Sequence, residues 1–126
     1  MDIKGKTAIV TGASSGIGAE FCRKLVVQGA TVYGLARRKK RLNDLHDELG
    51  DRFIPVKMDV TQISSIENWV NKTFGDELKP DILINNAGLG LFGPVDELSP
   101  EDWHTMIDVN LNGVLYLTRT IVPLMK

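Results

Sequence analysis

Cysteine and histidine are scarce in this chain, and no long hydrophobic run is present. The 126 residues include 1 cysteine and 2 histidines, so an internal disulfide and a cysteine-based zinc site are excluded. No apolar segment reaches the ~18 residues that a membrane-spanning helix needs. Residues 1–6 lack the apolar core of a signal peptide. We therefore expect no membrane association and a cytoplasmic location.

An excess of charge of either sign is also missing. The chain has 15 Lys and Arg against 16 Asp and Glu, a formal net charge of -1, so its charge predicts no general attraction to nucleic acid or anionic membranes. Hydrophobic residues make up 43% and charged residues 25% of the sequence, as in soluble globular domains. The length suits one domain with its own core, in which Cys22 is expected as a small buried hydrophobe.

A strand followed directly by a helix is predicted near the start of the chain. Residues 7–10 form an apolar run, which is typical of a short buried strand. Ile17, Phe21 and Leu25 recur every four residues, and this spacing predicts a helix with an apolar stripe formed by these side chains.

Three glycines lie between that strand and that helix. Gly12 allows a tight turn without a Cβ clash, Gly16 leaves room for a ligand near the backbone, and Gly18 permits close packing of the helix on the strand. The start of the helix offers unpaired N–H groups and the positive end of its dipole, which suit a phosphate. A tight structural turn without a ligand is the alternative. The pattern predicts a dinucleotide site formed by Gly12, Ala13, Ser14, Ser15, Gly16, Ile17 and Gly18.

Strands and helices alternate through the rest of the chain. Runs at residues 31–36, 53–58 and 81–85 predict three further strands, and Thr61 is expected to cap the helix after the third strand. This alternation predicts an α/β fold with a doubly wound parallel sheet, the Rossmann arrangement, in strand order 3-2-1-4. Pro55 fits a third strand at a sheet edge. A ligand is expected beyond the carboxyl ends of the first and fourth strands.

The last predicted helix contains an unfavourable residue in its middle. Ser99, Pro100 and Asp102 predict its start, because they match a capping box with proline in the first turn. Asn110 has low helix propensity, so an inward amide at this position would need a hydrogen bond or a water. A helix kink satisfied locally is the alternative. The inner face is predicted to consist of Met106, Val109, Gly113, Leu117 and Ile121.

The end of the second predicted strand favours one cofactor over another. An acidic residue there binds the ribose 2′-hydroxyl of NAD, whereas an arginine accommodates the 2′-phosphate of NADP. Here Ala36 is followed by Arg37 and Arg38, so we predict NADP(H) over NAD(H). The basic run 37–41 suggests a nucleic-acid patch as an alternative, but it has no interleaved aromatic residues. We expect no nucleic-acid partner, and residues 39–41 are interpreted as a solvated helix start.

Taken together, these motifs resemble the short-chain dehydrogenase/reductase family. The resemblance rests on residues 11–18, Asp59 with Val60, residues 85–88 and Asn110, and it extends from residue 6 to residue 126. It implies that residues 1–126 are the NADP(H)-binding Rossmann half of an oxidoreductase. Such enzymes move hydride between a nicotinamide and a small carbonyl or secondary alcohol. The family also implies a homo-oligomer, with the last helix at a subunit interface.

The resemblance assigns roles to the residues after the third and fourth strands. Asp59 would accept from the adenine amino group, and the Val60 amide would meet an adenine ring nitrogen. A purely structural alternative is that Asp59 caps the helix begun by Thr61. Asn85 would bridge backbone groups of neighbouring strands. The residues implied to line the ribose and nicotinamide are Asn86, Ala87 and Gly88.

The family's catalytic set is only partly represented. The resemblance implies that Asn110 holds a water linked to the catalytic lysine. That lysine lies four residues after a tyrosine, and a serine completes the set. Here Arg37 and Thr120 stand four residues after the two tyrosines, and no metal-ligand set is predicted. We therefore expect either part of a longer enzyme or a nucleotide-binding or structural module without turnover.

Overall fold

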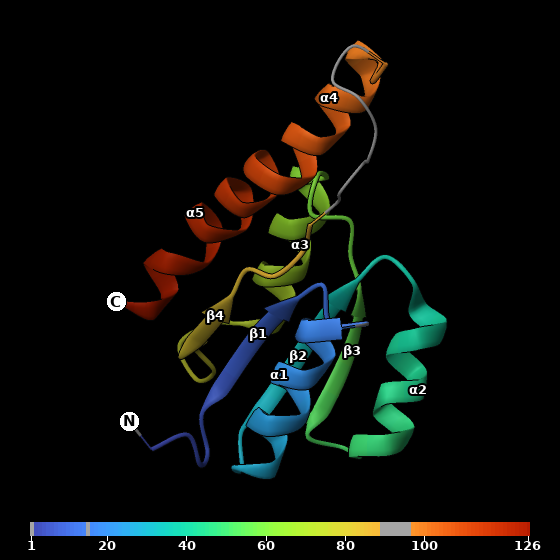
Figure 1. Ribbon diagram of the computed structural model, residues 1–126. Helices are drawn as coiled ribbons and strands as arrows, with labels where there is room; N and C mark the ends of the chain where they lie inside the picture. The colour runs from blue at the N-terminus through green and yellow to red at the C-terminus, as the bar shows by residue number, and fades with distance from the viewer. Residues whose placement is uncertain (1, 15, 89–96) are drawn as a thin grey trace.

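Four parallel strands form the centre of the computed structural model, which describes residues 2–14, 16–88 and 97–126 (Figure 1). The strands are β1 (Thr7–Thr11), β2 (Thr31–Ala36), β3 (Phe53–Lys57) and β4 (Ile82–Ile84). Their order in the sheet is β3-β2-β1-β4, and each neighbouring pair is parallel. The predicted α/β class and strand order are confirmed, with Pro55 on the edge strand β3.

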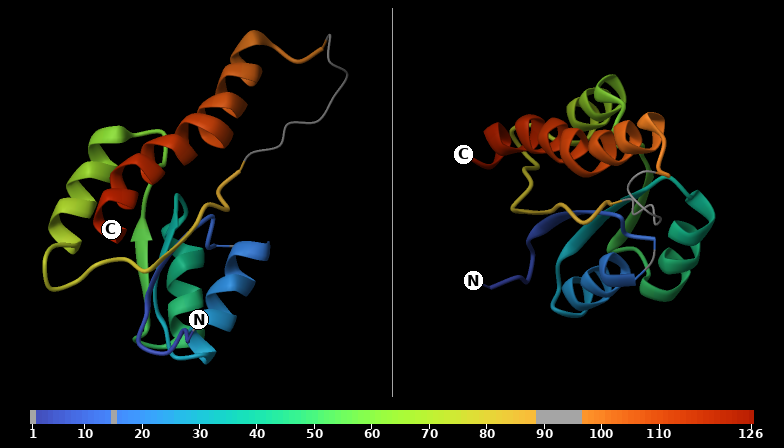
Figure 2. Two further views of the ribbon diagram at one scale, coloured as in Figure 1. Left: turned by 90° about the vertical axis from the view of Figure 1, so that its left-hand side faces the viewer. Right: turned by 45° about the horizontal axis from the view of Figure 1, so that its top comes forward.

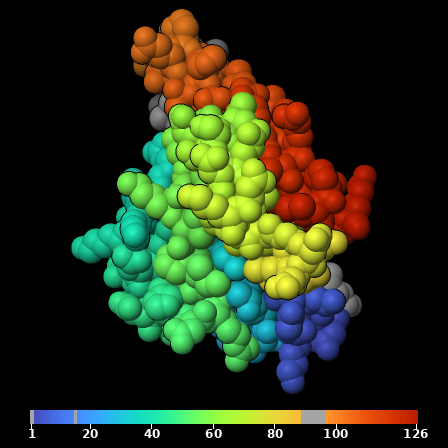
Figure 3. Space-filling view, turned by 180° about the vertical axis from the view of Figure 1, so that it is seen from behind, coloured from blue at the N-terminus to red at the C-terminus, as the bar shows by residue number. Residues whose placement is uncertain are grey.

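Helices cover both faces of this sheet (Figure 2). On one face lie α1 (Gly16–Val27) and α2 (Lys39–Leu49), and on the other lie α3 (Ile63–Thr73) and α5 (Gly113–Met125). Seen from behind, α3 and α5 lie side by side (Figure 3). At its N-terminal end, α5 continues from α4 (Pro100–Ile107) through the π-helical turn η1 (Asp108–Asn112).

The side chains of β1 alternate between the two layers. Ala8 and Val10 belong to the core beneath α1 and α2, whereas Ile9 belongs to the core beneath α3 and α5. All three are fully buried. Because a parallel sheet is covered on both faces, its strands are continuous apolar runs, which is why this strand was readable from sequence.

The helix predicted from the apolar stripe is confirmed as α1, but only part of that stripe contacts the sheet. Ile17 is 70% exposed and Phe21 is 40% exposed, whereas Leu25 is buried. A Cβ at Gly18 would overlap the carbonyl oxygen of Gly12, which shows how closely the helix approaches the strand end. The residues of α1 that are buried are Gly18, Ala19, Cys22 and Leu25.

The predicted cap of α3 is also wrong. The N-cap position is Gln62, and its side chain makes no capping hydrogen bond. The Thr61 hydroxyl instead donates to Asp59 Oδ1 at 2.7 Å. Since this hydroxyl is held by the preceding loop, the helix begins only at Ile63.

The rod formed by α4, η1 and α5 begins with the predicted capping box. Ser99 Oγ accepts from the Asp102 amide at 3.1 Å, and the Asp102 carboxylate accepts from the Ser99 amide at 3.1 Å. The helix then widens into η1, where Asn112 Nδ2 donates to Asp108 Oδ1 at 3.2 Å. Asn110, which has low helix propensity, lies inside this turn, and the helix is irregular there.

Candidate functional site

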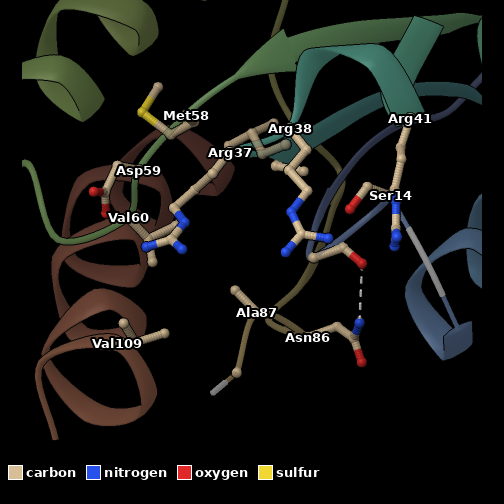
Figure 4. A pocket seen from close by; sticks show the side chains of 14 residues that line it. Ser14, Arg37, Arg38, Arg41, Met58, Asp59, Val60, Asn86, Ala87 and Val109 are labelled. Carbon is tan, nitrogen blue, oxygen red and sulfur yellow. Dashed lines mark hydrogen bonds between the residues drawn. The ribbon is translucent and has the colours of Figure 1, made fainter. Parts of the chain in front are cut away.

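A cavity of about 340 Å³ opens at the carboxyl ends of the strands (Figure 4). Its walls come from the segments that follow β1, β2, β3 and β4, and from η1. This is the position at which open parallel sheets bind ligands. The lining residues are Gly12, Ser14, Leu35, Ala36, Arg37, Arg38, Arg41, Met58, Asp59, Val60, Asn86, Ala87, Gly88 and Val109.

Most of the predicted cofactor-binding residues meet at this cavity. The structure brings together Gly12, Ser14, Arg37, Arg38, Asp59, Val60, Asn86, Ala87 and Gly88. Other predicted residues do not line it, namely Ala13, Gly16, Ile17, Gly18 and Asn110. The Ala13 side chain is fully buried and its amide donates to the Leu35 carbonyl at 3.2 Å. Ser15 lies outside the described residues.

The glycine turn has an unusual backbone conformation at two of its residues. Gly12 and Gly16 both have positive φ, at 63° and 58°, a region that residues with a Cβ rarely adopt. A Cβ at Gly12 would lie 3.0 Å from Asn86, whereas one at Gly16 would have no described atom within 4 Å beyond its own chain neighbours. The turn is therefore packed on its inner side and open at the start of α1, where a helix N-terminus favours anions.

Thr11, the last residue of β1, ties the glycine turn to the segment after β4. Its buried hydroxyl oxygen accepts from the Asn86 amide at 2.9 Å and from the Ala87 amide at 2.8 Å. Asn86 Nδ2 also donates to the Gly12 carbonyl at 3.4 Å. The sequence does not predict this role of Thr11, since a threonine at the end of a strand carries no signal of such a long-range contact.

The bridging role predicted for Asn85 belongs to its neighbour instead. Asn85 is exposed, and its Nδ2 donates to Thr118 Oγ1 on α5 at 3.1 Å. The side chain that links the ends of two strand segments is that of Asn86. The two amides point to opposite sides of the extended chain, so one contacts the helix layer and the other contacts the glycine turn.

Asp59 is held as a carboxylate at the rim of the cavity. Its Oδ1 accepts from the amide and the hydroxyl of Thr61, at 3.0 Å and 2.7 Å. Partial burial acts to raise the pKa of Asp59, but the two hydrogen bonds, together with the nearby positive charge of Arg37, outweigh it and hold the pKa below its ordinary value. Asp59 thus supports the loop before α3 and lines the cavity, but it does not cap the helix, whose N-cap residue is Gln62.

Three arginines also line the cavity. Arg37 and Arg38 follow β2, as predicted, and Arg41 from the first turn of α2 joins them. The sequence predicts Arg41 only as part of a solvated helix start, whereas the structure places it in the cavity lining. Its position at the cavity depends on how α2 docks on the sheet through Leu42 and Leu45, which no local pattern reveals.

Asn110 stands beside the end of the Asn-Asn-Ala-Gly segment. A Cβ at Gly88 would lie 3.5 Å from Asn110 Oδ1, and the neighbouring Val109 lines the cavity. The residue predicted for catalysis and the residues predicted for cofactor binding are therefore adjacent. Asn110 itself is exposed, and its Oδ1 faces Gly88.

Two kinds of feature are missing from the part of the chain that the structure describes. None of the helices there is long and apolar enough to cross a membrane. In the same residues, no group of three or more His, Cys, Asp and Glu side chains is placed to hold a metal ion.

Known proteins resemble this chain over nearly its whole length. A probable NADP-dependent dehydrogenase of Haemophilus influenzae is 38% identical over 122 residues, which are 96% of this chain and 48% of the relative. The NADP-dependent 3-hydroxy acid dehydrogenase YdfG of Escherichia coli is 42% identical over 116 residues, 91% of this chain and 47% of the relative. A solved closed form of serine dehydrogenase complexed with NADP+ has a TM-score of 0.87 and 41% identity, over 94% of this chain and 48% of that one.

These comparisons agree with the geometry of the site. The cofactor in the names of the relatives is the one predicted from the arginines after β2. The chain spans about half the length of the curated relatives it matches. A family model described as short chain dehydrogenase matches residues 6–126, and the chain therefore belongs to the short-chain dehydrogenase family.

Proposed function

We propose that this chain binds NADP(H) and serves as the cofactor-binding half of an oxidoreductase. The bound nicotinamide would supply or accept hydride, and the substrate would be a small carbonyl compound or secondary alcohol. The name of the Escherichia coli relative makes 3-hydroxy acids the first substrates to test.

The observation that carries this proposal is the charge of the cavity wall at the end of β2. Ala36 occupies the position where an acidic residue selects NAD(H), and Arg37 and Arg38 follow it in the cavity lining. Guanidinium groups form charge-assisted hydrogen bonds with phosphate. A cavity that combines these cations with a positive-φ glycine turn suits a phosphorylated dinucleotide.

Each wall of the cavity would perform a separate task. The glycine turn would hold the pyrophosphate through backbone N–H groups. Asp59 would accept a hydrogen bond from the adenine amino group, and Val60 would pack beside the ring. Asn86, Ala87 and Gly88 would border the ribose and nicotinamide, where small side chains leave space. Asn110 would hold a water near the reacting groups.

Exchange of Ala36 tests the cofactor assignment. Ala36→Asp would place a carboxylate beside the arginines, so it is expected to weaken NADPH binding at least about tenfold and to strengthen NADH binding. Ala36→Asn, which has nearly the same shape and no charge, is the matched control. Affinities of both cofactors would be measured by calorimetric titration. Equal affinity of wild-type protein for NADPH and NADH would refute the assignment.

A module that binds the nucleotide without turnover is the second candidate, because the sequence offers no tyrosine followed four residues later by lysine. Oxidation of NADPH in the presence of ketones, aldehydes and 3-oxo acids separates the two candidates. The module predicts tight NADPH binding with no oxidation above the rate without protein. Turnover that is lost in Asn110→Ala would support the oxidoreductase.

We also propose that the protein self-associates through the rod of α4, η1 and α5. Trp103, Ile107, Leu111 and Leu115 recur at intervals of four along it, and each is between 39% and 55% exposed. Such a stripe of large apolar side chains favours contact with another protein surface. Light scattering on wild-type protein and on Leu111→Glu would test this: the wild type is expected to be larger than a monomer and the variant smaller.

A further inference from the structure

The three arginines around the cavity do not occupy equivalent positions. In Figure 4 the Arg37 side chain extends toward Asp59 and Val60, whereas Arg38 and Arg41 lie on the side of Ser14. The positive charge of Arg37 contributes to the lowered pKa of Asp59, which places the two groups within electrostatic reach. The charge of Arg37 is therefore partly balanced by the protein itself.

Arg38 and Arg41 differ from Arg37 in this respect. Within the described residues, neither forms a hydrogen bond or an ion pair with another side chain. Arg41 also borders a smaller cavity of about 180 Å³ that contains the carboxylates of Asp44 and Glu48. Glu48 is already engaged, since its two oxygens accept from Arg23 Nε at 2.7 Å and from Arg23 Nη2 at 3.2 Å. Asp44 forms no ion pair with Arg41 among the described residues, so neither carboxylate of this cavity engages Arg41, and its guanidinium is available to a ligand.

The start of α2 adds to the positive potential at the same place. Arg38 is the N-cap residue, its side chain makes no capping bond, and the first turn contains no acidic residue. A helix start without negative compensation favours a bound anion. Leu42 and Leu45 are buried against the sheet, so they fix the turn from which Arg41 projects.

Resting on the NADP(H)-binding function proposed above, we infer that Arg41 is a specificity-determining residue. Together with Arg38 and Ser14, it binds the 2′-phosphate that distinguishes NADP(H) from NAD(H). Of the two arginines that follow β2, Arg38 thus carries the preference for the 2′-phosphate, whereas Arg37 lies on the side of Asp59 and Val60, the proposed adenine side, and contributes to both cofactors alike. Discrimination between the two cofactors therefore depends on Arg41 of α2 as well as on the residues at the end of β2.

Calorimetric titrations of NADPH and NADH into four forms of the chain test this inference. The forms are the wild type, Arg41→Ala, Lys40→Ala and Arg37→Ala. Lys40 is the matched control, because it is an exposed cation on the same helical turn and does not line the cavity. Circular dichroism would establish that all four are folded.

The expected result is a change in the ratio of the two affinities. Arg41→Ala should weaken NADPH binding about tenfold or more and leave NADH binding within about twofold. Lys40→Ala should change neither by more than about twofold, and Arg37→Ala should weaken both cofactors to a similar degree. Arg41→Lys, which keeps the charge but loses the planar fork, should recover part of the NADPH affinity.

Two results would overturn the inference, and they are distinguishable. If Arg41→Ala lowers the NADPH affinity no more than Lys40→Ala does, while the wild type still prefers NADPH, the role of Arg41 is refuted and the proposed function stands. If the wild type binds neither cofactor, the proposed function fails and this inference fails with it.

Discussion

Replacement of Thr11 by valine removes the acceptor that holds two backbone amides, while it preserves the shape of the side chain. Thr11 is 2% exposed, and its hydroxyl oxygen accepts from Asn86 and Ala87 at 2.9 Å and 2.8 Å. A buried donor that loses its partner costs about 1–3 kcal/mol. Both residues are half-buried, so the lower end applies to each. The expected loss in the free energy of unfolding is about 2 kcal/mol.

Urea denaturation followed by circular dichroism measures this loss. With a typical dependence of unfolding free energy on urea, about 2 kcal/mol shifts the midpoint by about 1 M. Thr11→Ser is the matched control: it keeps the hydroxyl and loses one methyl group, which costs about 1 kcal/mol. NADPH affinity should fall in Thr11→Val and stay near the wild-type value in Thr11→Ser. A valine variant as stable as the wild type would refute the reasoning.

Three further predictions follow from the packing and charge of single residues. Gly18→Ala places a methyl group on the Gly12 carbonyl, so it should lower the free energy of unfolding, measured by urea denaturation, by at least about 1–3 kcal/mol. Gly75→Ala is the control, because its new Cβ has no described atom within 4 Å, and it should leave the stability near the wild-type value. Asp59 has a lowered pKa in the fold, so its charge stabilises the protein above the unfolded-state pKa and this contribution is lost as pH falls through the folded-state pKa. The stability gap between wild type and Asp59→Asn should be wide at pH 7 and should narrow progressively as the pH falls below the unfolded-state pKa of about 4. Burial raises the pKa of the Cys22 thiol to about 12, so at pH 8 a thiol reagent should label it slowly in the native protein and rapidly in 8 M urea.

The strand order was predictable because the sheet imposes a simple pattern on the sequence. Each strand is covered on both faces, so it is a short apolar run, and the alternation of strands with helices admits few topologies. Helix faces were less predictable. In α1 most of the buried residues are small, and of the apolar stripe only Leu25 is buried, whereas Ile17 and Phe21 are exposed. Close packing of a helix on a strand favours glycine, alanine and cysteine. These small residues contribute little to the hydrophobic periodicity from which a helix face is predicted.

The candidate site was predictable where a motif is contiguous and not where it depends on docking. The glycine turn and the Asn-Asn-Ala-Gly segment are local sequences, and both lie at the carboxyl end of the sheet. Arg41, Met58 and Val109 reach the cavity only because α2, the loop after β3 and η1 come together there. The hydroxyl of Thr11 bonds residues 75 and 76 positions away, and a single sequence carries no record of such a contact.

The contact between Gly113 and Val60 joins the cofactor cavity to the helix that carries Asn110. A Cβ at Gly113 would lie 2.6 Å from Val60 Cγ2, so the valine occupies the space that any side chain at position 113 would need. Gly113 directly follows η1, and Val109 of η1 lines the same cavity as Val60. The π-helical turn is thereby held between the Asp59–Val60 wall and the end of the Asn-Asn-Ala-Gly segment. A ligand that displaces Val60 is therefore expected to shift the turn that carries Asn110, which would couple the proposed cofactor site to the placement of this residue.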